Sequence, residues 1–239
     1  MAKIISASRR TDIPRYYSRF FAERREAGDV EFRNVFGGKS VASLRRKDVH
    51  GYLFWTRFAG PFVANLQALR EERIPCVFQY TITGYGEDLE PHTPNTGEAI
   101  EDFRAVSAIL EKPACIQWRY DPLVVSDTYD VGWHLENFAR IASGLRGATE
   151  VVNTSLIEPY RRTILRVDDA TVRYRPIDPN RHKWAARNRP DLLQADESVH
   201  RLVSDLYDIA DQQRMQLRAC SNRELDLPAS QCCSAEMFA

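Results

Sequence analysis

Apolar, strand-like runs alternate with segments of helical periodicity, and this alternation limits the possible folds more than any other feature. The runs lie at 4–5, 30–35, 51–56, 75–83, 114–120, 151–156 and 216–219. Segments with a helical pattern lie between them at 14–28, 61–69, 97–110, 134–145 and 196–215. Strands joined by helices form right-handed βαβ units with a buried parallel sheet. We therefore predict an α/β protein, a single (β/α) barrel that is complete or partial.

A doubly wound sheet is the alternative to the barrel. No Gly-x-Gly-x-x-Gly motif follows any of the runs, which disfavours a dinucleotide site. No repeat or low-complexity linker divides the 239 residues, a length at which single α/β barrels are common. We expect one domain over 1–239, with a basic insertion around 160–190 and a cysteine-containing tail at 220–239.

Bulk composition excludes little, because 33 Lys and Arg residues balance 33 Asp and Glu residues. No apolar run approaches the roughly 20 residues needed to cross a bilayer. The N-terminus lacks the charged, apolar and small-residue order of a signal peptide. We therefore expect a cytoplasmic protein without a membrane partner, of unspecified oligomeric state.

The five cysteines are unevenly placed, and three of them crowd the last twenty residues. A cytosolic chain of this size does not need disulfides, so the tail cysteines raise a metal or redox question. Cys220 and Cys232 are candidate metal ligands, but a closed four-ligand site is not spelled out. No His-x-x-x-His, Gly-x-Ser-x-Gly, P-loop or Cys-x-x-Cys motif is present, which disfavours the commonest hydrolases, NTPases and zinc ribbons.

The stretch 4–14 combines a short buried strand, a polar cluster and a helix start. Asp12 is a candidate N-cap, and Pro14 suits a first helical turn. Ligands bind at the carboxyl ends of strands in open α/β sheets and barrels. The polar residues of this strand end are therefore candidate ligand-binding residues: Ser6, Ser8, Arg9, Arg10 and Thr11.

Three further strand ends repeat the combination of an arginine with a small or planar polar group. These ends are Arg33-Asn34, Trp55-Thr56-Arg57 and Arg119-Tyr120-Asp121, and their candidate ligand-binding residues are Arg33, Asn34, Trp55, Thr56, Arg119 and Tyr120. Neutral donors from other strands are Gln79, Thr81 and Ser155. Guanidinium groups make bidentate contacts to carboxylate or phosphate, so we predict a mouth that binds a small anionic molecule. Asp12 and Asp121 are the carboxylates available for acid–base chemistry.

These residues also have purely structural explanations. Arg9 with Asp12, and Arg119 with Asp121, could be ion pairs that hold loops to the sheet. A degenerate barrel that binds no ligand would have its mouth closed by such pairs. His134 is the one histidine considered for chemistry, and a capping or surface role is the expected alternative.

A basic segment supports a different function, the binding of nucleic acid. Its cations are Arg161, Arg162, Arg166, Arg173, Arg175, Arg181, Lys183, Arg187 and Arg189. Tyr160, Tyr174 and Trp184 are interleaved with them, as stacking platforms for bases would be. A solvated insertion balanced by acids elsewhere is the competing explanation, and the net charge of zero favours it.

Several of these motifs resemble an uncharacterised bacterial family catalogued as domain of unknown function 1848. The resemblance runs from residue 4 to about residue 233 and rests on the sequences at 5–14, 33–34, 54–56, 78–83, 118–122 and 134–138. It implies a barrel similar to that of radical S-adenosylmethionine enzymes.

The resemblance also implies a cofactor that this sequence does not spell out. Typical members continue into a Cys-x-x-x-Cys-x-x-Cys motif that would hold an iron–sulfur cluster. Cys220 and Cys232 match cysteines that precede that motif, which is absent from this chain. S-adenosylmethionine and an iron–sulfur cluster are therefore implied only for a longer form, and enzymatic activity stays open.

Overall fold

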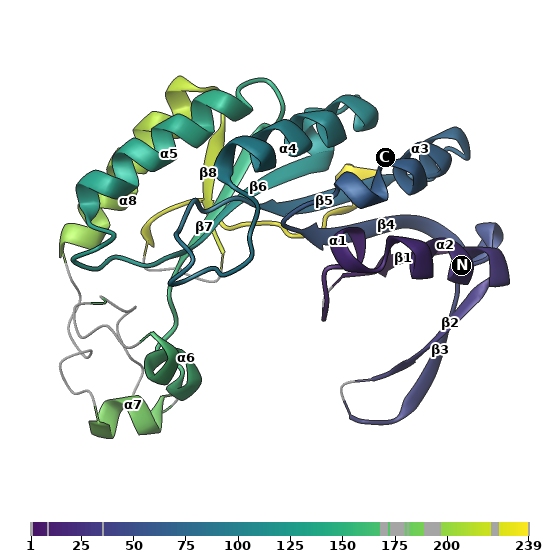
Figure 1. Cartoon of the computed structure of the whole chain (residues 1–239), viewed down its shortest axis with the longest axis horizontal. Coiled ribbons are helices and arrows are strands. Elements are labelled where there is room, and N and C mark those ends of the chain that lie inside the picture. The colour runs from purple at the N-terminus through teal and green to yellow at the C-terminus, as the bar shows by residue number, and fades with distance from the viewer. Residues whose placement is uncertain are drawn as a thin grey trace.

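Six parallel strands form the central sheet of the computed structural model (Figure 1). They are β1 (Lys3–Ser6), β4 (Val49–Thr56), β5 (Cys76–Thr81), β6 (Ile116–Leu123), β7 (Val151–Leu156) and β8 (Gln216–Ala219). They lie side by side in this order, without the reversal that defines a doubly wound sheet. The α/β class is confirmed. A complete barrel is not formed, because β1 and β8 are opposite edges of an open sheet in the described chain.

The structure describes residues 2–8, 10–34, 36–167, 172, 180, 182–188, 197–220 and 225–238. Among them, no helix is both long and apolar enough to span a membrane.

Four helices follow successive strands and gather along one face of the sheet (Figure 1). They are α3 (Val63–Glu71), α4 (Thr96–Leu110), α5 (Val131–Leu145) and α8 (Glu197–Gln212). Crossovers of one hand between sequentially ordered strands bring every helix to the same face. Alternate strand residues such as Phe54, Phe78 and Trp118 point toward these helices and form the main core with them.

The segment after β1 forms two helices instead of the single helix predicted over 14–28. These are α1 (Ile13–Tyr16) and α2 (Ser18–Ala27), and Tyr17 interrupts them with φ −131°. Of the predicted buried stripe only Phe21 is buried, while Tyr17 and Phe20 are exposed. The ring of Phe21 packs against three aromatic rings, so one residue anchors α2 to the sheet. Gly28 ends α2 with φ 83°, as predicted.

The predicted strand at 30–35 belongs to a separate hairpin that extends away from the sheet (Figure 1). It comprises β2 (Asp29–Arg33) and β3 (Lys39–Ser43), paired antiparallel. Asn34 holds the turn, because its Oδ1 accepts hydrogen bonds from the backbone N–H groups of Phe36 at 3.0 Å and Gly38 at 3.1 Å. Arg33 and Asn34 are therefore not at the end of a parallel strand.

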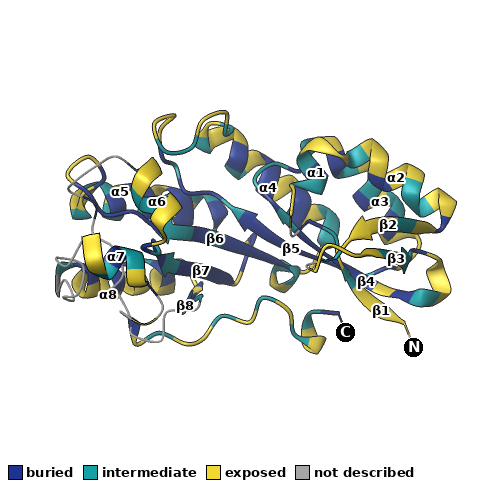
Figure 2. Cartoon of the chain, turned by 90° about the horizontal axis from the view of Figure 1, so that it is seen from below, coloured by how far each residue is buried: buried dark blue, intermediate teal, exposed yellow. Residues whose placement is uncertain are grey.

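The C-terminal tail, residues 225–238, covers the face of the sheet opposite the helices, here called the inner face (Figure 2). Its last turn is a 3-10 helix, Ala235–Phe238. Phe238 is buried against Leu53 and Val77. A Cβ at Gly51 would lie 2.6 Å from the Phe238 ring, so the close approach requires glycine at this position.

Three amide side chains line the middle of the inner face and are fully buried: Gln79, Gln117 and Asn153. Gln117 Oε1 accepts from Gln79 Nε2 and from Asn153 Nδ2, each at 2.9 Å. Gln79 Nε2 also donates to the carbonyl oxygen of Cys232 at 3.2 Å. These bonds satisfy most of the buried amide groups, which would otherwise be costly to bury, and they tie the tail to the sheet. Asn153 Oδ1 has no hydrogen-bond partner in the described part of the chain.

We expect Phe238→Ala to lower the free energy of unfolding by about 3 kcal/mol, because it removes a ring buried between β4, β5 and the tail. Urea denaturation measures the effect. Phe36→Ala is the matched control, since Phe36 is 93% exposed in the hairpin turn and should change stability by less than about 0.5 kcal/mol. Equal denaturation midpoints for the two variants would contradict this packing of the tail.

Candidate functional site

The carboxyl edge of the sheet carries a partly buried ion pair on its inner face. Arg119 Nη2 and Ser155 Oγ both donate hydrogen bonds to the carboxylate of Asp121. The side chains of Arg119 and Asp121 are only 12% and 13% exposed. Burial alone would lower the pKa of Arg119, but the charge of Asp121 beside it holds that pKa above its ordinary value. This pair corresponds to the structural alternative that the sequence offered for these two residues.

A second ion pair joins the end of β4 to the long loop after β5. Arg57 contacts Glu90 through two bonds, Nη1 to Oε2 at 2.6 Å and Nη2 to Oε1 at 2.7 Å. Thr83 Oγ1 donates to the same carboxylate. A bidentate contact of this kind fixes the plane of the guanidinium as well as its position.

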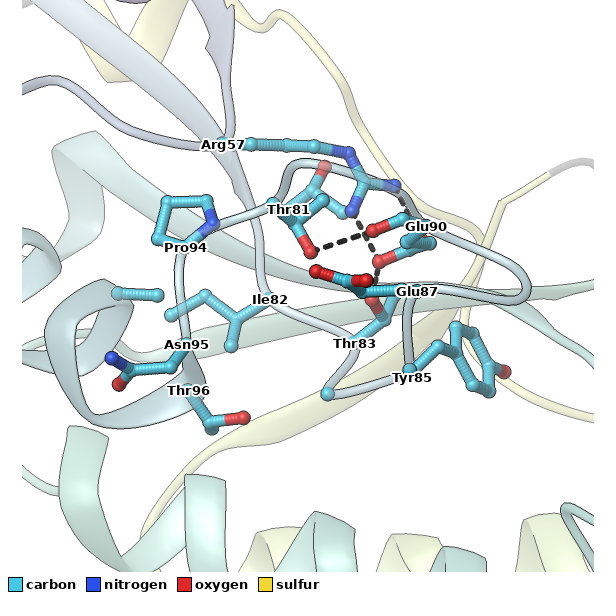
Figure 3. A pocket seen from close by; sticks show the side chains of 14 residues that line it. Arg57, Thr81, Ile82, Thr83, Tyr85, Glu87, Glu90, Pro94, Asn95 and Thr96 are labelled. Carbon is cyan, nitrogen blue, oxygen red and sulfur yellow. Dashed lines mark hydrogen bonds and ion pairs between the residues drawn. The ribbon is translucent and has the colours of Figure 1, made fainter.

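A pocket of about 320 Å³ lies beside this pair (Figure 3). Its wall includes Arg57, Thr81, Thr83, Asn95 and Thr96. The last two residues are the N-cap and first residue of α4, so the N-terminus of a 15-residue helix contributes to the wall. Figure 3 shows the carboxylate of Glu87 directed into the pocket. The pocket thus combines a guanidinium, a helix N-terminus, several hydroxyls and two carboxylates, those of Glu87 and Glu90.

Asp12 joins the β1–α1 turn to the end of β4. Its carboxylate accepts three hydrogen bonds: from Arg15 N at 3.0 Å, Thr56 Oγ1 at 2.8 Å and Arg57 N at 2.9 Å. Burial raises the pKa of Asp12, and these hydrogen bonds partly oppose the rise. Asp12 caps α1 as predicted, and the same contacts position the backbone of Arg57 at the pocket.

The other polar residues after β1 are spread over the surface and the interior. Ser6, Arg10 and Thr11 are exposed, and Arg10 Nη1 donates to the carbonyl oxygen of Arg33 at 2.9 Å. Ser8 is buried, and its Oγ has no hydrogen-bond partner in the described part of the chain. Arg9 lies outside the described residues.

The remaining predicted residues divide between the two faces of the sheet. Thr56 and Tyr120 are buried in the layer between the sheet and its helices. Trp55 packs near Phe238 on the inner face, and Gln79 belongs to the buried amide group. Of the predicted ligand-binding residues, Thr81 lines the pocket, and so does Arg57 from the strand end Trp55-Thr56-Arg57.

His134 is fully buried, and therefore the expected capping or surface role is wrong. Its Nε2 lies 3.1 Å from the carbonyl oxygen of Val124, which can only accept, so Nε2 carries the proton. Nδ1 then accepts from the hydroxyl of Tyr120 at 2.9 Å. Burial lowers the pKa of His134 to about 4 and keeps the ring neutral.

This histidine belongs to a buried network that reaches the backbone beside the pocket. Asn137 Nδ2 donates to the hydroxyl of Tyr120 at 3.1 Å and to the carbonyl oxygen of Thr83 at 2.7 Å. Gly84 follows with φ 77°, and a Cβ there would lie 2.5 Å from Asn137 Oδ1. The network therefore fixes the start of the loop that forms one wall of the pocket.

The tail brings Cys220 and Cys232 together next to Arg119. The thiol of Cys220 hydrogen-bonds with Cys232, and Arg119 Nη2 lies 3.8 Å from Cys220 Sγ. This hydrogen bond and the charge of Arg119 lower the pKa of Cys232, while sharing the hydrogen bond raises the pKa of Cys220.

The described residues do not fit the iron–sulfur cluster that the family resemblance implies. No group of three or more His, Cys, Asp or Glu side chains in the described chain is arranged to hold a metal ion. Cys220 and Cys232 contact each other and a guanidinium, whose positive charge opposes cation binding. We assign no metal to this pair.

The basic segment is described in part, as α6 (Arg161–Arg166) and α7 (Lys183–Asn188). The guanidinium of Arg161 lies over the ring of Trp184 at 5.7 Å, so one proposed stacking platform already has a cation on it. Arg173, Tyr174, Arg175, Arg181 and Arg189 lie outside the described residues. The nucleic-acid alternative stays a prediction.

Sequence reasoning missed most of the pocket, including Thr83, Glu87 and Glu90. The available signal was the length of the connection between β5 and α4, from Ile82 to Asn95. Loops in α/β units usually have about 2–6 residues, and longer ones are commonly functional.

The sheet and the pocket first define a class: an α/β protein with an open parallel sheet and a polar pocket at its carboxyl edge. Within this class, residues 4–239 match the family described as a domain of unknown function (DUF1848), and the chain belongs to that family. No curated protein and no solved structure matches the chain.

The depressed pKa of His134 predicts a specific dependence of stability on pH. In the unfolded chain the imidazole of His134 takes up a proton near pH 6.5. In the folded protein the same ring takes up a proton only near pH 4. Stability from the neutral ring is therefore complete above pH 6.5 and is lost as the pH falls toward 4. We expect a loss of roughly 2–3 kcal/mol between pH 7 and 4.5 from this group.

His134→Gln should reduce this slope, because glutamine retains an N–H for Val124 but does not titrate. Urea denaturation at several pH values measures the slope. His200→Gln, an exposed position on α8, is the control and should retain the wild-type slope. An unchanged slope in His134→Gln would show that the histidine is not buried in its neutral form.

Proposed function

We propose that this protein binds a small polar molecule with a carboxylate or phosphate group in the pocket at the carboxyl edge of β5. The observation that carries the proposal is that Arg57 and the N-terminus of α4 line the same pocket. The two are the positive groups of this wall, and their fields favour an anion between them.

The ion pair with Glu90 leaves Arg57 able to bind such a group. A guanidinium has five N–H donors, and the bidentate contact uses two of them. The side chain of Arg57 is 33% exposed and that of Glu90 only 13%. Glu90 therefore acts as a positioning residue that aims Arg57, while Arg57 faces the pocket.

The size and polarity of the pocket limit the ligand. A volume of about 320 Å³ is at the lower end for small-molecule sites. Hydroxyls of Thr81 and Thr96 suit a ligand with several polar groups, and Glu87 suits a hydrogen-bond donor or amine on its far side. A compact molecule with an anionic end and a donor end fits this lining.

The proposed function is ligand binding, and we assign no reaction to the pocket. Asp12 and Asp121 make hydrogen bonds that hold the rim together, and Glu87 is a carboxylate that faces the pocket. The open sheet, with helices on one face, is consistent with a partial (β/α) barrel of the kind that the family resemblance implies. Because the described cysteines do not fit an iron–sulfur cluster, the proposal includes no radical step.

Arg57→Met should weaken binding of inorganic phosphate or citrate by roughly 10- to 100-fold, the effect of losing charge-assisted hydrogen bonds worth about 1.5–3 kcal/mol. Isothermal titration calorimetry measures the dissociation constants. Because the variant leaves Glu90 unpaired, the double variant Arg57→Met/Glu90→Gln is tested beside it and should show the same loss in a better-folded background.

Arg19→Met is the control, since Arg19 is 93% exposed on α2 and pairs only with Glu23 in the described contacts. It should bind both probes like the wild type. The proposal is wrong if neither probe binds the wild type at millimolar concentration, or if the Arg57 variants bind as tightly as the control.

A further inference from the structure

The fold brings the two cysteines of the tail together by a short stretch of strand-like pairing. Cys220 directly follows β8, and Cys232 comes twelve positions later. Ala219 N donates to the carbonyl oxygen of Pro228 at 2.9 Å, and Ser230 N donates to the carbonyl oxygen of Ala219 at 2.8 Å. These backbone bonds return the chain to the end of β8, so the meeting of the two thiols follows from the fold.

The surroundings of the two sulfur atoms are specific. The thiol of Cys220 donates a hydrogen bond to Cys232, and Arg119 Nη2 lies 3.8 Å from Cys220 Sγ. The hydroxyl of Ser230 lies 4.0 Å from Cys232 Sγ. Both cysteines are partly exposed, whereas Cys76 is buried in the core. A small reagent can therefore reach this pair.

A dithiol beside a guanidinium is suited to exchange with disulfides. The nucleophile in this exchange is a thiolate, and a neighbouring positive charge stabilises it. The same charge opposes binding of a metal cation. The ion pair with Asp121 holds Arg119 in place beside the sulfur atoms.

We propose that Cys220 and Cys232 form a thiol–disulfide exchange site whose substrates are low-molecular-weight disulfides. The thiolate of Cys232 attacks one sulfur of the substrate, forms a mixed disulfide and releases the first thiol. Cys220 gives up its proton and attacks Cys232 Sγ, which releases the second thiol and leaves a Cys220–Cys232 disulfide. Two protein thiols are oxidised, and one substrate disulfide is reduced to two thiols.

The reaction would change the structure where the tail meets the sheet. The disulfide would link the end of β8 covalently to the segment that crosses the inner face. It would also remove the thiolate that contacts Arg119. The exchange site lies on β6, β8 and the tail, whereas the proposed ligand pocket lies on β4, β5 and α4, so each can fail without the other.

The test incubates the Cys233→Ser variant of the whole chain with glutathione disulfide at pH 7. This substitution removes the neighbouring thiol, and trypsin then separates Cys220 from Cys232 by cutting after Arg218 and Arg223. We expect the intact protein to lose the mass of two hydrogens and to retain no glutathione. A non-reducing digest should contain the peptide 219–223 joined to 224–239.

Cys220→Ser/Cys233→Ser tests the order of the steps. Without the second thiol, Cys232 should keep one glutathione as a stable mixed disulfide. Cys232→Ser/Cys233→Ser should take up glutathione at least about 10-fold more slowly, because the thiol of Cys220 lacks its partner. Circular dichroism confirms that each variant is folded.

Three results would overturn the proposal: an unmodified Cys233→Ser protein, a Cys233→Ser protein that keeps bound glutathione, or a disulfide to Cys76 or Cys115 in the digest. Equal rates of glutathione uptake in the two double variants would overturn the assignment of Cys232 as the attacking thiol.

Discussion

A parallel sheet with helices on one face leaves its other face to be buried by something else, and the rest of this structure depends on how that is done. Here the C-terminal tail crosses the inner face and places Phe238 over Leu53 and Val77. The strands keep amides at their centres, and these bond both to one another and to the tail. The sheet stays open, and chain that follows its last strand covers part of its inner face.

The inner face changes character from one end of the strands to the other. Leucine and valine lie where Phe238 packs, amides occupy the middle, and Arg119 and Asp121 lie at the carboxyl edge. The alternation of strand residues sends neighbours in the sequence to opposite faces. Arg119 therefore reaches the cysteines of the tail, while Tyr120 joins the buried network of His134 and Asn137.

The sequence predicts this architecture unevenly, for physical reasons. The strand at 151–156 and the strand at 216–219 have their predicted bounds, because period and turn residues are local signals. The apolar run at 30–35 has the same local pattern, but its partner is the adjacent strand of a hairpin. The periodicity of a strand does not specify which other strand it pairs with. The pair of Arg57 with Glu90 joins residues 33 positions apart, so no local pattern reveals it.

The two partly buried arginines of the carboxyl edge, Arg57 and Arg119, show why an arginine-rich strand end is not by itself a ligand site. Arg119 is enclosed, with Asp121 on one side and two sulfur atoms on the other, so its charge is used within the protein. Arg57 also has a carboxylate partner, but the geometry of that pair leaves part of the guanidinium facing a pocket. The two arginines differ in the groups that surround each guanidinium beyond its carboxylate partner. A guanidinium surrounded by internal acceptors stabilises a fold or a thiolate, whereas one that is paired with a carboxylate at the wall of a pocket keeps N–H donors for an external anion, as we propose for Arg57.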